Sequence, residues 1–140
     1  WCMKVAAEYT HRRNYMFMYM YEQNVFKKNL VSFIEPSCGM FVTLVINFKP
    51  EWNISETKRI MDYLYCCLTE EGCSAVLGYK MVVNRDYSME RANFLRFTCA
   101  KARDPNVFKI GAERINAAVE RLFEEYNVNE QFTLGPKGII

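Results

Sequence analysis

The sequence contains few of the residues that most catalytic and metal sites require. It has one histidine, His11, and no two of its six cysteines form a CxxC pair. A metal site is therefore not expected, because structural zinc sites draw their ligands from closely spaced Cys and His residues. The phosphate-binding glycine motifs GxGxxG and GxxxxGK[ST] are absent. His11 is far from any Ser or Cys in a suitable context, so a nucleophile–base pair is not expected either.

Long apolar runs and targeting signals are also absent. No segment approaches the ~20 apolar residues of a transmembrane helix, and no secretory signal peptide is visible. The net charge of +2 is too small to indicate a nucleic-acid or membrane partner. The scattered cysteines are typical of buried thiols in a reducing compartment, so we expect a cytoplasmic protein. A redox or metal role for Cys66, Cys67 and Cys73 is the less favoured alternative.

The composition is that of one globular domain. The 140 residues are 51% hydrophobic and 24% charged, enough for a single core but short for two. The chain begins at Trp1 in a stretch that already has the composition of a helix interior. We therefore expect a fragment of a longer protein, although an expression remnant or a processed precursor would explain this start equally well.

Residues 1–28 lack Pro and Gly and are rich in helix formers, which predicts one long helix. Within it, "YMFMYMY" (15–21) alternates aromatic residues with methionines, a period that would also suit a strand. The absence of a turn residue before it favours the helix. A helix that is apolar all round should be covered on most sides.

Four segments have the β-branched and aromatic composition of strands. "LVSFIEP" (30–36) ends at a proline, and "MFVTLVINF" (40–48) follows a turn. "CSAVLGYKMVV" (73–83) is interrupted by Gly78, and a polar loop (84–93) leads to the fourth segment, which ends at Ala100.

Two further helices are predicted between and after these strands. Asn53 and Glu56 have capping-box spacing for a helix over about 54–71, and Gly72 stands where a C-terminal glycine belongs. Asp104 and a first-turn proline begin the last helix. Its expected inner stripe is Val107, Ile110, Ile115, Val119, Leu122, Phe123 and Tyr126.

The predicted order is α–β–β–α–β–β–α. This indicates a two-layer α+β domain, with helices packed on a small mixed or antiparallel sheet after a long first helix.

One arginine interrupts the fourth strand, "NFLRFTCA" (93–100). Side chains alternate along a strand, so Leu95, Phe97 and Cys99 should face the core while Arg96 lies on the other face. Arg96 could simply be solvated or paired with an acid such as Glu90. Alternatively, its planar fork could bind a carboxylate through two parallel hydrogen bonds.

A different class of function is an RNA- or protein-binding module that uses its sheet face. "CGMFVTLV" (38–45) loosely matches an RNA-recognition strand, but Cys38 replaces the basic residue and Met40 the first aromatic. Without the cation and a stacking ring, a core strand is the better interpretation.

Four ordered stretches carry a family resemblance: "EYTHRRN" (8–14), "EPSCGMFV" (35–42), "LTEEGCSAVLGYKM" (68–81) and "FLRFTCA" (94–100). Together with the closing helix, they resemble the C-terminal small domain of fold-type I, pyridoxal-phosphate-dependent class I/II aminotransferases. The similarity is greatest to the kynurenine, α-aminoadipate and fungal aromatic aminotransferases. It spans about residues 5–126 of a single domain covering 1–140, with residues 127–140 as a tail.

The resemblance implies three substrate-binding residues. Arg96 matches the family's arginine that holds the substrate α-carboxylate, and Phe41 matches an aromatic residue of the pocket. Met81 matches a further pocket residue, at a position where an aromatic is common. Leu77 stands where the family usually has proline.

The resemblance also implies parts that this chain lacks. In the family, pyridoxal 5′-phosphate and its Schiff-base lysine belong to a large domain, so no catalytic or cofactor-binding residue is assigned here. Lys58 in "SETK" (55–58) does not have the family's sequence context and is rejected. We expect the isolated chain to be inactive. The full-length enzyme is expected to be a homodimer that acts on amino acids and 2-oxo acids, with no nucleic-acid or membrane partner.

Overall fold

The helices and strands form two layers, as the sequence predicts. The computed structural model describes residues 1–81 and 91–127. Its main elements are α1 (Cys2–Tyr21), α2 (Asn24–Lys27), β1 (Val31–Ile34), β2 (Phe41–Ile46), α3 (Thr57–Glu70), β3 (Val76–Leu77), β4 (Phe94–Thr98) and α5 (Pro105–Glu125). Two 3₁₀ turns, η1 (Ile54–Glu56) and η2 (Gly78–Met81), precede α3 and follow β3.

The four strands form one antiparallel sheet in the order β1-β2-β4-β3. β4 is therefore an interior strand, with β2 along one edge and β3 along the other. Arg96 lies opposite Thr43 of β2 and Val76 of β3. Backbone pairing on both sides fixes the position of this residue.

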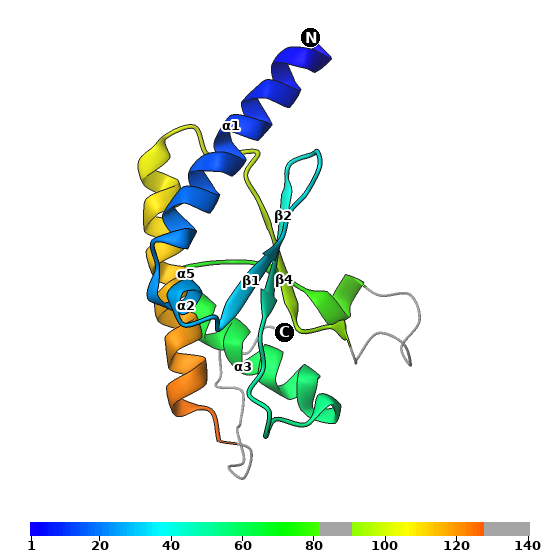
Figure 1. Ribbon diagram of the computed structural model, residues 1–140, viewed down its shortest axis with the longest axis vertical. Helices are drawn as coiled ribbons and strands as arrows, with labels where there is room; N and C mark the ends of the chain where they lie inside the picture. Colours follow the sequence, from blue (N-terminus) through cyan, green and yellow to red (C-terminus); the bar gives the residue numbers. More distant parts are fainter. Residues whose placement is uncertain (82–90, 128–140) are drawn as a thin grey trace.

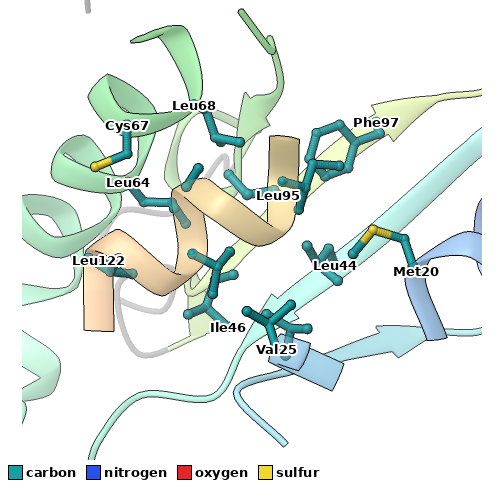
Figure 2. Close-up of a cluster of buried hydrophobic side chains, with 14 of the residues drawn as sticks. Met20, Val25, Leu44, Ile46, Leu64, Cys67, Leu68, Leu95, Phe97 and Leu122 are labelled. Carbon is teal, nitrogen blue, oxygen red and sulfur yellow. The ribbon is translucent and has the colours of Figure 1, made fainter. Parts of the chain in front are cut away.

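The three long helices lie on one side of the sheet (Figure 1). α5 contacts both α1 and α3. The sheet face toward them, which we call the covered face, consists of Val31, Phe33, Val42, Leu44, Ile46, Leu77, Leu95 and Phe97; all but the partly buried Phe33 are buried. Figure 2 shows Met20 of α1, Leu64 of α3 and Leu122 of α5 converging on these strand residues. Burial of apolar surface between the layers is the main stabilising contribution.

The predicted helix ends are confirmed by cap geometry. The side chain of Asp104 accepts a hydrogen bond from the backbone N–H of Asn106 at 2.9 Å. Asn53 accepts one from the N–H of Ser55 at 3.1 Å. Gly72 has φ +75°, the left-handed conformation that ends a helix at little cost only for glycine.

The predicted single helix over 1–28 is wrong, because the chain breaks between α1 and α2. Gln23 is extended, with φ −76° and ψ 150°. Past this break, the backbone N–H of Val25 donates to Oδ1 of Asn116 on α5, at 3.1 Å. A side chain from another helix thus replaces an intrahelical acceptor, and Val25 becomes fully buried.

Segment 15–21 is helical and covered on most sides, as expected, since only Met18 and Tyr21 in it are exposed, by 45% and 57%. Two further predictions need correction. Of the predicted strand 73–83, only two residues form β3, η2 follows, and residues 82 and 83 lie outside the described part. On α5, Val107 and Ile110 are exposed. The buried stripe starts instead at Phe108 and continues through Ala112 and Ile115, because it follows the 3.6-residue period from a different first residue.

Within residues 1–81 and 91–127, no helix is long and apolar enough to cross a membrane.

Candidate functional site

The site is the side of the sheet that the helices leave uncovered. This open face consists of Ser32, Ile34, Phe41, Thr43, Val45, Val76, Phe94, Arg96 and Thr98. Ile34, Phe41 and Val76 are exposed hydrophobic residues, and the others on the face are partly buried or, like Thr98, exposed. Arg96 is the one charged residue among these nine. The face therefore presents a single cation in apolar surroundings.

Arg96 and Phe41 are in direct contact on this face. The guanidinium carbon of Arg96 lies 4.4 Å from the centre of the Phe41 ring. Such a cation–π contact contributes about 0.5–1 kcal/mol at an exposed site. It also holds the guanidinium without using its N–H donors.

The side chain of Arg96 has no acidic partner in the described part of the chain. Among residues 1–81 and 91–127, it makes no hydrogen bond and no ion pair. Glu90, the acid considered from the sequence, lies outside these residues. The donors of Arg96 are thus available to an anion that the rest of the described chain does not supply.

The turn before β2 places Phe41. Gly39 has φ +92°, a conformation that side chains rarely adopt, and it reverses the chain just before the strand. The carbonyl of the next residue, Met40, accepts from the backbone N–H of Cys99 at 2.9 Å. This bond ties the start of β2 to the end of β4, so the ring and the arginine have a fixed relative position.

Met81 is placed differently from the other two predicted site residues. It is the last residue of η2 and is partly buried. η2 packs against the first residue of β4 at Gly78, where an added Cβ would lie 2.6 Å from Cε1 of Phe94. The structure thus brings Arg96 and Phe41 into contact, whereas Met81 belongs to η2, a separate element that packs against the start of β4.

Sequence reasoning missed an acidic residue near η2. Asp62 on α3 is buried, and its carboxylate accepts from the Tyr79 hydroxyl and from Nζ of Lys58, the latter at 2.6 Å. The available signal was an aspartate four residues after a lysine, directly beside the apolar position Met61. Lys58, rejected as a cofactor lysine from its sequence context, is engaged in this ion pair.

Two arginines of "EYTHRRN" were also missed as structural residues. Nη1 of Arg12 donates to the carbonyl of Ala100, just after β4. Nη1 of Arg13 donates to the carbonyl of Pro36, just after β1, at 2.7 Å. α1 therefore holds the loops at the end of the sheet where Phe41 begins its strand.

The cysteines and the histidine do not form a metal site in the described residues. All six cysteines are free, and residues 1–81 and 91–127 contain no group of three or more His, Cys, Asp or Glu suited to a metal ion. Burial raises the pKa of the Cys66 and Cys73 thiols, and it raises that of Cys67 to about 12. Their thiolates are disfavoured, which argues against reactive thiols there.

A surface hollow of the described residues lies elsewhere. It has a volume of about 460 Å³ and is lined by residues from the start of α5, the loop after α3 and the end of β4, including Cys73, Phe97, Val107 and Ile110. Arg96 and Phe41 do not line it.

Comparison with known proteins identifies the family. The chain is 34% identical to aromatic amino acid aminotransferase 2 of Saccharomyces cerevisiae over 126 residues, which is 90% of this chain and 25% of that protein. Its fold matches the crystal structure of the aromatic aminotransferase Aro9 from C. albicans, with a TM-score of 0.77 and 30% identity over 83% of this chain and 24% of that one. The chain is homologous to the C-terminal small domain of class I/II aminotransferases.

A more distant structure supports the fold alone. LysN, an α-aminoadipate aminotransferase from Thermus thermophilus, has a TM-score of 0.60 and 19% identity over 83% of this chain. No protein-family model matches the chain. The chain spans about a quarter of the length of these aminotransferases.

Proposed function

We propose that residues 1–140 are the substrate-carboxylate-binding small domain of a pyridoxal-phosphate-dependent aminotransferase. The full-length enzyme would transfer an amino group from an aromatic or α-aminoadipate-like amino acid to a 2-oxo acid. The observation that carries the proposal is Arg96, which lies at the centre of the open face, stacked on Phe41, and has no anionic partner among the described residues.

Arg96 would bind the substrate α-carboxylate. Its two parallel N–H groups match the two oxygens of a carboxylate, and such charge-assisted bonds contribute about 1.5–3 kcal/mol each. The apolar surroundings strengthen this attraction once the substrate excludes water. Phe41 would orient the guanidinium and contact the substrate side chain, and Met81 would supply a second apolar wall at the end of η2.

We assign no residue of this chain to holding the cofactor. Lys58, whose context already argued against a Schiff-base role, is engaged with Asp62 at the start of α3. When bound, pyridoxal phosphate supplies the electron sink for amino-group transfer. We propose that the remainder of the full-length protein binds it, that the isolated chain is inactive and that the enzyme is a cytoplasmic homodimer.

The experiment is a transaminase assay on the full-length protein and its Arg96→Ala variant, with aromatic donors and 2-oxo acid acceptors. We expect kcat/KM for every amino-acid donor to fall at least about tenfold. A tenfold loss is about the equivalent of one charge-assisted hydrogen bond.

The matched control is Arg114→Ala, which removes the same charge from α5, where Arg114 bonds only to the carbonyl of Gly72 among the described residues. Its kcat/KM should stay within about twofold of the wild type. An unchanged kcat/KM in Arg96→Ala would contradict the assignment.

A further inference from the structure

Asp62 forms a buried polar cluster between α3 and η2. Only 5% of the residue is exposed, and both of its carboxylate oxygens are used. Oδ1 accepts from the hydroxyl of Tyr79, and Oδ2 accepts from Nζ of Lys58 at 2.6 Å. Nζ of Lys58 also lies 5.3 Å from the centre of the Tyr79 ring.

This cluster holds η2 from the side of α3, and β4 holds it from the other side. Gly78, the first residue of η2, lies so close to Phe94 of β4 that a Cβ would approach Cε1 to 2.6 Å and the carbonyl oxygen of Ala92 to 2.9 Å. The next residue, Tyr79, carries the hydroxyl that bonds to Asp62. Two successive residues of η2, Gly78 and Tyr79, are thus held by neighbouring elements. Met81 is the last of the four residues of η2.

The hydroxyl of Tyr79 remains a donor over the whole neutral range. Burial, with the hydrogen bond to Asp62 as a smaller cause, raises the pKa of Tyr79 above its ordinary value. Asp62 therefore faces one cation, Lys58, and one neutral donor, so its charge is compensated.

A buried ion pair is poor evidence of a stabilising role, because desolvation offsets most of the attraction and an apolar residue of similar size is often as stable. Such a cluster does fix geometry. A directional hydrogen bond sets the orientation of the Tyr79 side chain, which apolar packing alone would not do. The hydrogen bond thereby fixes Tyr79 within η2, the element that ends at Met81.

We infer that Asp62 is a positioning residue for substrate recognition, which acts through Tyr79 to fix η2 and the pocket wall formed by Met81. This inference rests on the proposed function. Arg96, on a strand held by two neighbours, does not depend on this cluster. Loss of the cluster should therefore affect recognition of the donor side chain and not recognition of the carboxylate.

The test uses the full-length protein and the variants Tyr79→Phe and Asp62→Ala, with L-phenylalanine and L-alanine as donors. We expect the ratio of kcat/KM for phenylalanine to that for alanine to change at least fivefold in both variants. The control is Tyr63→Phe, which makes the same chemical change on α3 at a hydroxyl that donates to Glu125 at 3.1 Å. Its ratio should stay within twofold of the wild type.

Hydrogen–deuterium exchange on the same proteins provides a readout that does not need activity. The backbone amides of residues 78–81 should exchange at least tenfold faster in Tyr79→Phe and no faster in Tyr63→Phe. Unchanged exchange there, or equal losses for both donors, would overturn the inference. If the wild-type protein transaminates neither donor, the proposed function fails, and the exchange measurement still decides whether Asp62 and Tyr79 fix η2.

Discussion

The two faces of the sheet are made by the same strands yet differ in how far this chain completes them. On the covered face, Leu44 and Leu95 lie opposite each other and are fully buried beneath the helices. On the open face, Phe41 is 46% exposed and Arg96 stacks on it with no acid to pair with among the described residues. The chain's own helices bury the covered face. The open face instead presents an aromatic ring and a guanidinium that a substrate could contact.

This difference indicates where stability and function lie. Stability follows buried apolar area, so it concentrates on the covered face. A binding face must instead keep polar groups available, and these contribute little until a ligand arrives. Substitutions on the two faces should therefore separate the two properties.

The largest effect on stability is expected from truncation on the covered face. Leu44→Ala should lower the free energy of unfolding by about 2–5 kcal/mol, because it leaves a cavity in a packed core. Phe41 lies on the same strand but on the open face. Phe41→Ala should lower the free energy of unfolding by less than about 1 kcal/mol, since nearly half of that residue is already in water. Urea denaturation of both variants measures the contrast, and equal losses would remove the distinction between the faces.

A smaller effect is expected where β4 meets η2. Gly78→Ala should cost about 1–3 kcal/mol, because its Cβ would overlap the ring of Phe94. Gly111→Ala on α5 is the matched control, since nothing lies within 4 Å of its Cβ. Alanine is the better helix former, so this control should be stabilised by about 0.5–1 kcal/mol. A Gly78→Ala variant as stable as the wild type would show that η2 is not tightly held.

A further effect, confined to alkaline pH, is the pH dependence of the core beneath the covered face. Burial raises the pKa of the Cys67 thiol from 9.0 to about 12. Between these values, the unfolded chain releases this proton and the folded chain keeps it. The unfolded state then binds fewer protons, so the free energy of unfolding should fall as the pH rises from 9 to 12.

Thermal melts across this pH range test the pH dependence. Cys67→Ala should flatten the decline of the melting temperature with pH, whereas Cys38→Ala, at an exposed position, should not. An identical decline in wild type and Cys67→Ala would contradict the role of this thiol.

Sequence reasoning predicts the features that local pattern determines. The alternation in "FLRFT" places Leu95 and Phe97 inward and Arg96 outward, and the turn and cap residues locate the ends of the main helices. It could not predict the break at Gln23, because the acceptor that replaces the helical bond, Asn116, is 91 residues away from Val25.

For the candidate site, too, the sequence predicts some residues and misses those that depend on long-range packing. Arg96 and Phe41, the two residues that the family resemblance implies for the site, lie in contact, and their roles remain predictions. The cluster of Asp62 and Tyr79 depends on the packing of α3 against η2, two elements whose relative position no local pattern determines. The sequence signal for this cluster was an aspartate four residues after a lysine, directly beside the apolar position Met61.

The most direct test of the account compares an amino acid with its decarboxylated analogue as amino donors. In the wild-type full-length protein, L-phenylalanine should be preferred over 2-phenylethylamine, which lacks the carboxylate that Arg96 would bind. In Arg96→Ala, which removes both charge-assisted hydrogen bonds, the ratio of the two kcat/KM values should fall by at least about 10- to 100-fold, the equivalent of one of them. A preference that is unchanged in this variant would show that Arg96 does not bind the substrate carboxylate.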